Sequence, residues 1–253
     1  MTNIDSSKKN QAHQNYERRS ARLDLKDNQF TSRKFYHIRK DSKPKKILHS
    51  FGRIAMRLND KKSAIIRTDD LDKVCFILIN NYKKRPNSHG VGPLNDGFLI
   101  ALNQHRLGFK IFYLYNPRRD EFSYFLGFFM KNTKVDLTVF YSGLNSIDNK
   151  SIEFCNGPLS KSVVGDVISQ NCNKKARVLF LTDCCDGGSV FDIHKINPKN
   201  FTQPAKLISF FVNKSHSPDS KESKRSHGLF TYYFCKIIKD SPNISTYKLV
   251  EKM

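Results

Sequence analysis

One segment, residues 178–189, reads Val-Leu-Phe-Leu-Thr-Asp-Cys-Cys-Asp-Gly-Gly-Ser. Its four consecutive apolar residues are typical of a strand that is covered on both faces, as in a parallel sheet. The pair Gly187-Gly188 allows the backbone to turn sharply just beyond that strand. We therefore expect Cys185 at the carboxyl end of a buried strand. The loops at that end are where open α/β sheets collect ligands and reactive side chains.

On both sides of this segment, apolar runs with strand character alternate with segments of helical periodicity. This order predicts an α/β fold with a mainly parallel sheet, right-handed crossovers and helices on both faces. The predicted strands are residues 74–79, 109–115, 135–141, 177–182 and 207–212, and the predicted helices are residues 94–107, 118–131, 160–170 and 229–238.

Residues 183–189, Asp-Cys-Cys-Asp-Gly-Gly-Ser, resemble the nucleophile motif Asp-Ser-Cys-His-Ser-Gly-Ser of metacaspases and caspase-like cysteine peptidases. The resemblance places Cys185 on the nucleophile and implies a caspase-like sheet of about six strands. Three further segments follow in the family's order and extend the resemblance over residues 71–250. They are residues 74–82 with Leu94-Asn95-Asp96, residues 139–145 (Val-Phe-Tyr-Ser-Gly-Leu-Asn), and residues 227–234 (His-Gly-Leu-Phe-Thr-Tyr-Tyr-Phe).

The resemblance fails at the catalytic base. The family's histidine falls on Leu144, and the glycine whose N–H helps to bind the oxyanion falls on Asn145. A cysteine peptidase needs a group that deprotonates the thiol and protonates the leaving amine, and imidazole does both near neutral pH. Leucine does neither. We therefore expect a caspase fold that is not an enzyme, in which Cys185 is a vestigial nucleophile.

Two acids of the family's substrate pocket carry over by motif, Asp96 and Asp183, at positions that recognise a basic P1 side chain. The alternative interpretation, which we favour, is that they serve as hydrogen-bonding residues at a helix start and a strand end. His89, in the polar turn after the first predicted strand, is the histidine that could replace the base. If it does, the chain is an active cysteine endopeptidase that cleaves after Lys or Arg.

Residues 1–70 are predicted to form a basic extension, and residues 71–253 the caspase-like domain. Residues 1–28 are polar and charged, which is typical of an arm that cannot fold alone. A helix is predicted over residues 47–58, packed on the domain with a basic face outward. The predicted partner-binding residues of this extension are Arg33, Lys34, Arg39, Lys40, Lys43, Lys45, Lys46, Arg53 and Arg57.

The charge balance points to an acidic partner. Lys and Arg number 44 against 23 Asp and Glu, a formal net charge of +21. Nucleic acid, an anionic membrane and an acidic protein polymer all fit that charge. Because no RNA-binding signature is present, we favour a tubulin-like polymer, the microtubule lattice, over a ribonucleoprotein.

The sequence also bears on the cellular location of the protein and on whether it holds disulfides, metals or cofactors. No secretory signal and no membrane-spanning run is visible, and the cysteines lie mostly inside apolar runs rather than at disulfide spacings. We therefore expect a cytoplasmic, possibly cytoskeletal, protein with reduced thiols. No Cys-x-x-Cys or His-x-x-x-His spacing and no acidic calcium cluster around Asp192 is present, so we expect neither a metal nor a cofactor.

Overall fold

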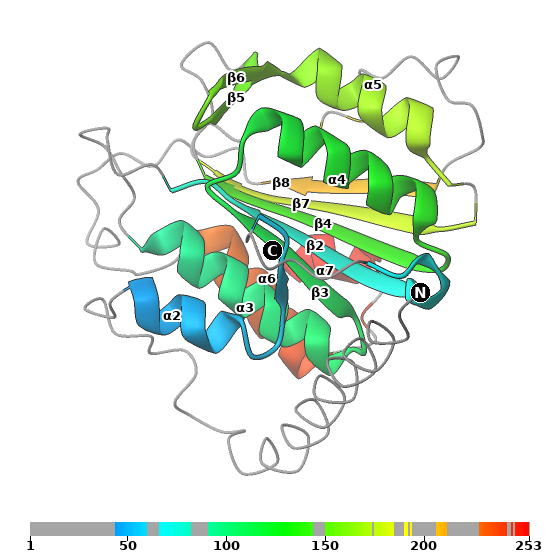
Figure 1. Cartoon of the computed structure of the whole chain (residues 1–253). Coiled ribbons are helices and arrows are strands. Elements are labelled where there is room, and N and C mark those ends of the chain that lie inside the picture. Colours follow the sequence, from blue (N-terminus) through cyan, green and yellow to red (C-terminus); the bar gives the residue numbers. More distant parts are fainter. Residues whose placement is uncertain are drawn as a thin grey trace, which may run out of the picture. The chain divides into compact units, whose positions relative to one another are not determined.

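A parallel sheet lies between two layers of helices in the part of the chain that the structure describes (Figure 1). This computed structural model describes residues 44–59, 66–81, 91–143, 150–173, 175–184, 190–191, 193, 206–211, 228–241, 244 and 246–252. The chain divides into two units, residues 1–41 and 42–253, and every described element belongs to the second.

The sheet has six strands, and each hydrogen-bonded pair of neighbours is parallel. The predicted α/β class and mainly parallel sheet are therefore confirmed. The central strands are continuous apolar runs because both of their faces are covered, and the core residues of β2 are less than 1% exposed. In spatial order the strands are β1 (Met56–Arg57), β3 (Lys110–Tyr115), β2 (Lys73–Ile79), β4 (Asp136–Gly143), β7 (Arg177–Cys184) and β8 (Lys206–Phe211).

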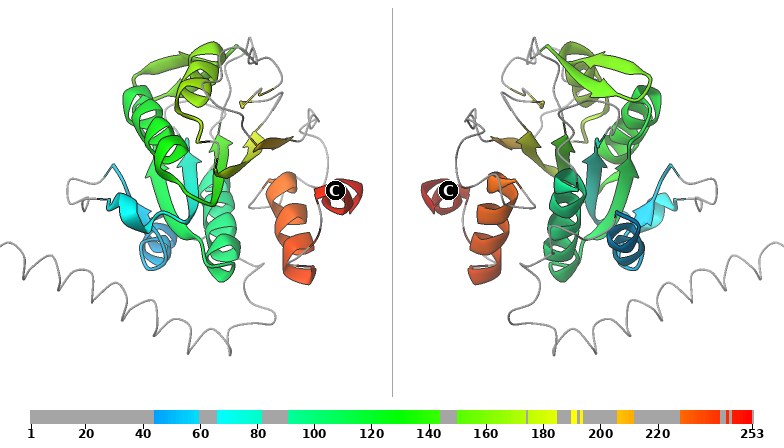
Figure 2. Two further views of the ribbon diagram at one scale, coloured as in Figure 1. Left: turned by 90° about the vertical axis from the view of Figure 1, so that its right-hand side faces the viewer. Right: turned by 90° about the vertical axis from the view of Figure 1, so that its left-hand side faces the viewer.

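Helices cover both faces of the sheet, as predicted (Figure 2). On one face Phe129 of α4 packs against Phe76 of β2, with ring centroids 5.1 Å apart. On the other face a Cβ on Gly97 of α3 would lie 2.6 Å from Ile79 Cδ1, so glycine lets this helix approach the sheet closely. The first layer holds α4 (Arg119–Asn132) and α5 (Lys161–Asn171); the second holds α2 (Pro44–Phe51), α3 (Gly92–Arg106) and α6 (Leu229–Asp240), with α7 (Thr246–Lys252) beside α6.

A small antiparallel hairpin was not predicted from the sequence. It consists of β5 (Ser151–Phe154) and β6 (Gly157–Ser160). Asn156 in its turn accepts a hydrogen bond from the Arg119 N–H (2.8 Å), which satisfies a free donor at the start of α4. Asn80, at the end of β2, donates to the Glu153 carbonyl (2.7 Å). The hairpin thus connects the first turn of α4 to the carboxyl edge of the sheet.

The helix predicted over residues 47–58 is wrong in its second half. The helix α2 ends at Phe51, the chain turns, and β1 joins the sheet beside β3. Ile54 and Leu58 are buried without being helical, so their spacing reflects burial on a folded-back path. The packed position of the helix itself is confirmed, because Phe51 stacks on Tyr113 with centroids 4.2 Å apart. Residues 44–59, predicted to belong to the extension, therefore pack on the same sheet as the rest of the domain.

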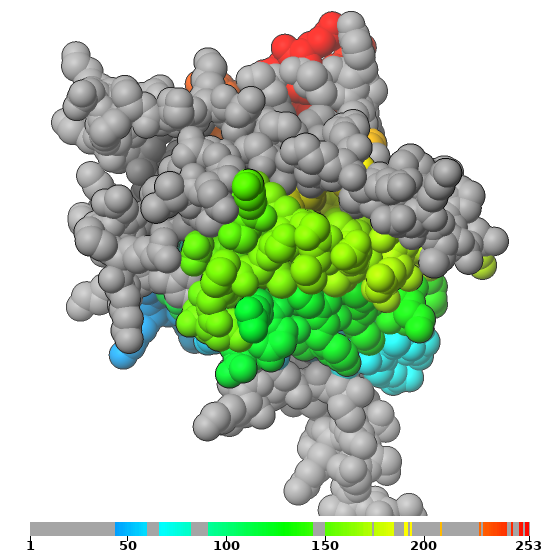
Figure 3. Space-filling view, turned by 90° about the horizontal axis from the view of Figure 1, so that it is seen from above, coloured from blue at the N-terminus to red at the C-terminus, as the bar shows by residue number. Residues whose placement is uncertain are grey.

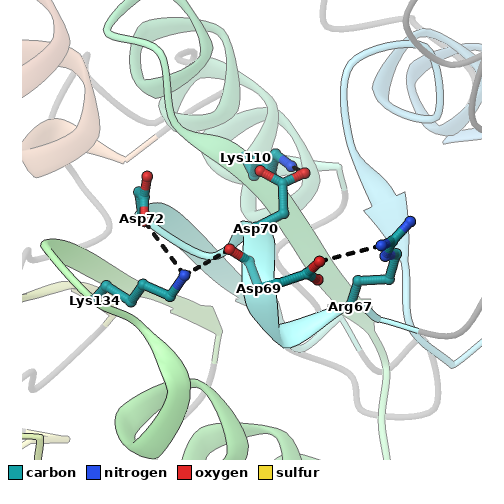
Figure 4. Close-up of polar contacts among 6 residues, drawn as sticks. All are labelled: Arg67, Asp69, Asp70, Asp72, Lys110 and Lys134. Atoms are coloured by element: carbon teal, nitrogen blue, oxygen red, sulfur yellow. Dashed lines mark hydrogen bonds and ion pairs between the residues drawn. The ribbon is translucent and has the colours of Figure 1, made fainter.

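The amino edge of the sheet carries matched charges (Figure 4). The short 3-10 helix η1 (Thr68–Asp70) places two carboxylates next to β2. Four ion pairs form at this edge: Arg67 with Asp69 (3.1 Å), Lys110 with Asp70, Lys134 with Asp72 (3.9 Å), and, at the starts of β7 and β4, Arg177 with Asp136 (2.7 Å). The side chains of the first three pairs are well exposed, so water and salt screen these pairs and they contribute little to stability. The residues drawn are three bases and three acids, so their formal charges cancel.

Candidate functional site

The carboxyl edge of the sheet brings together the strand ends that the sequence singled out. The last residues of β4 and β7, Gly143 and Cys184, are paired in register across neighbouring parallel strands. Leu144 follows the first of them in the chain and Cys185 follows the second. Leu144, Asn145, Cys185 and His89 themselves lie outside the described residues. The structure therefore describes the ends of the two strands that lead into the predicted site.

Asp96 connects three elements at this edge. It lies in the first turns of α3 and is 3% exposed. Ser142, near the end of β4, donates its hydroxyl to Asp96 Oδ2 (2.9 Å). The backbone N–H of Gly228, which precedes α6, donates to Asp96 Oδ1 (2.8 Å). Both carboxyl oxygens are thus engaged by the protein's own donors.

Asp183, near the end of β7, holds the first turn of α6. Its Oδ2 accepts hydrogen bonds from the Thr231 N–H (2.8 Å) and from the Thr231 hydroxyl (2.6 Å). A carboxylate at a helix amino terminus also meets the positive end of the helix dipole. Gly228 lies so close to Asp183 that a Cβ at this position would collide with both carboxyl oxygens. A side chain at position 228 would force either the Asp183 carboxylate or the start of α6 to move.

The electrostatics of the site follow from burial. Burial raises the pKa of Asp96 well above its ordinary value, and the nearby charge of Asp183 raises it further. These two effects outweigh the hydrogen bonds from Gly228 and Ser142, which act in the opposite direction. Burial also raises the pKa of the Cys235 thiol in α6, and the charges of Asp96 and Asp183 add to that effect. Cys235 is therefore an inert core thiol rather than a second nucleophile.

The structure brings the two predicted pocket acids together through α6. The donors from Gly228, Thr231 and Ser142 give both carboxylates a hydrogen-bonding role at a helix start and a strand end. That is the interpretation favoured from the sequence. A role in recognising a basic side chain stays a prediction.

The predicted basic residues are separated by the structure. Lys45 and Lys46 are exposed on α2, and Arg53 is exposed in the turn that follows. Arg57 lies on β1 instead of on a helix. Its Nε donates to Asn59 (3.1 Å) and its guanidinium lies over the Tyr115 ring, 5.6 Å from the centroid. The remaining predicted residues, Arg33, Lys34, Arg39, Lys40 and Lys43, lie outside the described residues.

Sequence reasoning missed the donors that hold the two acids. Ser142 lies within the segment that resembles the family's β4 end, and Gly228 and Thr231 lie within the segment that resembles its late helix. Their positions in these motifs could have identified them as candidate site residues. The sequence could not have shown which acid each one contacts, because Gly228 and Asp96, for example, are 132 residues apart in the chain.

Neither a metal site nor a membrane span is found among the described residues. No group of three or more His, Cys, Asp and Glu side chains in this part of the chain is placed to hold a metal ion. None of the helices there is long and apolar enough to cross a membrane.

The fold is similar to solved caspases. Caspase-1 from Spodoptera frugiperda superimposes with a TM-score of 0.50 at 13% identity, over 72% of this chain and 74% of that one. Pro-sf-caspase-1 gives a TM-score of 0.50 at 14% identity, over 79% and 80%. A protein from Geobacter sulfurreducens gives 0.51 at 16% identity, over 72% and 89%. The sequence matches no protein-family model and no curated protein. At such identities the likeness establishes a caspase-like fold and nothing finer.

Proposed function

We propose that this caspase-like protein is a non-catalytic structural or adaptor component that docks on an acidic assembly. The observation that carries the first half of this proposal is the residue that follows β4. Gly143 is the register partner of Cys184, and the residues that follow these two strand ends are Leu144 and Cys185. In the family that this sequence resembles, the first of those positions holds the histidine and the second holds the nucleophile.

The chemistry explains why the substitution matters. Attack on a peptide carbonyl requires a thiolate, and collapse of the tetrahedral intermediate requires a proton for the departing amine. An imidazole within hydrogen-bond reach of the sulfur supplies both functions because it titrates near neutral pH. An aliphatic side chain has no lone pair that could accept the thiol proton. It also has no acidic proton that it could donate to the leaving amine. The two carboxylates of the described edge do not replace it, since both are already engaged by Ser142, Gly228 and Thr231.

We expect no thiol-dependent cleavage of peptides that carry Lys or Arg at P1. In serine peptidases, loss of the catalytic histidine lowers turnover on the order of a millionfold, and a comparable loss would leave the rate at background. The measurement is single-turnover hydrolysis by the full chain, with the Cys185→Ser variant beside it, and both rates should be the same.

A rate that falls in Cys185→Ser would contradict the non-catalytic proposal. His89→Ala then decides what replaces it. If both substitutions abolish cleavage, the chain is a cysteine endopeptidase with Cys185 as nucleophile and His89 as the relocated base. His105→Ala, on α3, is the matched control and should leave any such rate unchanged.

The second half of the proposal is supported by charge. The chain carries +21, and Lys45, Lys46 and Arg53 are each exposed on or just after α2. An acidic protein polymer attracts such a surface at long range, and contacts of this kind weaken as salt rises. Among acidic assemblies we favour the microtubule lattice, with a ribonucleoprotein as the second candidate.

Co-pelleting with microtubules tests the docking. We expect the full chain to co-pellet, and the variant Lys45→Glu, Lys46→Glu, Arg53→Glu to bind about tenfold more weakly or worse. The control variant Lys175→Glu, Lys236→Glu, Lys252→Glu changes the net charge by the same amount, but at positions away from α2. It should weaken binding much less. Equal weakening by both triple variants would contradict a docking role for α2. Displacement of the chain from microtubules by low concentrations of RNA would favour the ribonucleoprotein.

A further inference from the structure

The outer side of α4 carries an exposed aromatic ridge. Tyr124 is 65% exposed, the highest value among the large apolar side chains of the described residues. Its ring stacks on Phe128 with centroids 6.4 Å apart and meets Phe125 edge-on at 5.1 Å. Phe125 and Phe128 are partly buried and pack against the hydrophobic core. Tyr124 and the two partly buried phenylalanine rings together form a small apolar patch on the outer side of α4.

The ridge is flanked by opposite charges at helical spacing. Glu121, Tyr124, Phe128 and Lys131 follow one another at steps of three, four and three residues, so they lie on one side of α4. The opposite side carries the fully buried residues Phe122, Leu126 and Phe129, which face the sheet. Figure 3 looks down on this layer, with α4 in green beside α5 in yellow-green. The ridge therefore belongs to the outer side of the helix layer.

The order of these four residues is self-complementary. Glu121 and Lys131 are each five positions from Leu126, and Tyr124 and Phe128 are each two positions from it. Suppose that a second α4 packs antiparallel on the outer side of the first, with a two-fold axis at the level of residue 126 along the helix. Glu121 then lies opposite Lys131 of the second copy, and Tyr124 lies opposite its Phe128. The same two pairs recur on the other side of the axis. This is the property that an isologous two-fold interface requires.

We propose that α4 is the interface of a symmetric dimer, in which two copies of this chain pack their α4 helices antiparallel. The aromatic rings supply the apolar centre, and the two Glu121–Lys131 pairs at the ends set the register. A second copy is favoured over an unrelated protein because the acid–base pair Glu121 and Lys131 and the aromatic pair Tyr124 and Phe128 share one midpoint on the helix, residue 126. An unrelated partner places no such constraint on this side of α4.

Sedimentation equilibrium of the full chain tests the dimer at near-physiological salt. We expect reversible association over roughly micromolar to 100 µM protein, and we expect Tyr124→Glu to raise the dissociation constant about tenfold or more. Because Tyr124 is exposed, the variant should keep the circular dichroism and melting temperature of the parent. Val163→Glu is the matched control, since Val163 is 42% exposed on the neighbouring helix α5. A chain that is monomeric throughout, or a dimer that is indifferent to Tyr124→Glu, would overturn the proposal and leave the ridge to a different protein.

A charge exchange tests the antiparallel register. Lys131→Glu alone and Glu121→Lys alone each place like charges opposite one another twice, so each should dimerise poorly. An equimolar mixture should form a heterodimer in which both pairs are complementary again. Failure of the mixture to recover association would overturn this register. Glu121 also accepts a hydrogen bond from the Arg118 N–H (2.8 Å), so circular dichroism must first show that Glu121→Lys is folded.

A cysteine pair gives a second test that leaves Glu121 untouched. Under mild oxidation, a mixture of Tyr124→Cys and Phe128→Cys should cross-link faster than either variant alone. The unsubstituted chain supplies the background, since Cys155 is exposed. Equal cross-linking in all three samples would overturn the antiparallel arrangement.

Discussion

Phe129→Ala is expected to lower the free energy of unfolding by about 3–5 kcal/mol, the range for removing a buried aromatic ring. Phe129 is fully buried, and its ring contacts Phe76 of β2 (5.1 Å between centroids) and Phe112 of β3 (4.9 Å). It therefore joins α4 to two adjacent strands at once. Truncation removes those contacts and leaves a cavity between elements that cannot close independently. Urea denaturation followed by circular dichroism measures the loss.

Tyr124→Ala is the matched control for this change. It removes an aromatic ring of similar size from the same helix, but from a side chain that is 65% exposed. We expect a loss below about 1 kcal/mol, as for surface substitutions generally. Both variants are compared at protein concentrations low enough for the monomer to prevail. Equal losses in the two variants would show that α4 does not contribute to the core in the way described.

The central strands could be predicted because burial on both faces leaves a continuous apolar run in the sequence. The run from Val74 to Ile79 and the run from Val178 to Leu181 each became a strand at the expected place. The ladder that joins them through β4 was not readable residue by residue. It follows from parallel pairing, which aligns Gly143 with Cys184.

Short elements escaped prediction because local spacing is ambiguous. Ile54 and Leu58 have the spacing of a helix face, yet they are buried along a turn and the approach to an edge strand. In the hairpin β5–β6 each strand has only four residues. The first alternates polar and apolar residues, but the second, Gly-Pro-Leu-Ser, does not, and the role of the hairpin depends on the contact of Asn156 with Arg119. In both cases the tertiary surroundings, not the local sequence, decide the structure.

The acids of the candidate site could be predicted from the sequence, but the groups that donate hydrogen bonds to them could not. Asp96 and Asp183 were identified through motif resemblance, and the structure places both near α6. One of their donors, Ser142, lies on β4, but Gly228 and Thr231 lie in a segment more than forty residues beyond Asp183. The need for glycine at position 228 arises only when that segment meets β7. A sequence shows that a glycine is present, but it does not show which carboxylate lies against it.

Gly228→Ala should therefore be among the most damaging single changes at the site, with an expected loss of about 2–4 kcal/mol in the free energy of unfolding. The added Cβ would collide with both carboxyl oxygens of Asp183, so either that carboxylate or the start of α6 must shift. Overpacking of this kind costs about 1–3 kcal/mol. A shift also weakens the hydrogen bonds from Gly228 to Asp96 and from Thr231 to Asp183, and bonds to charged groups contribute about 1.5–3 kcal/mol each. Chemical denaturation gives the loss.

A double-mutant cycle separates the steric cause from a general intolerance of alanine at that place. In an Asp183→Ala background the colliding oxygens are gone, so Gly228→Ala should cost less than about 1 kcal/mol there. Gly52→Ala, just after α2, is the matched control, because its Cβ would lie 3.4 Å from the nearest atom, an ordinary contact. If Gly228→Ala is as costly without the Asp183 carboxylate as with it, the close approach is not what requires glycine. A large loss in the first background and a small one in the second would tie the entry into α6 to the same acid that ends β7, beside the strand end where a peptidase would need its histidine.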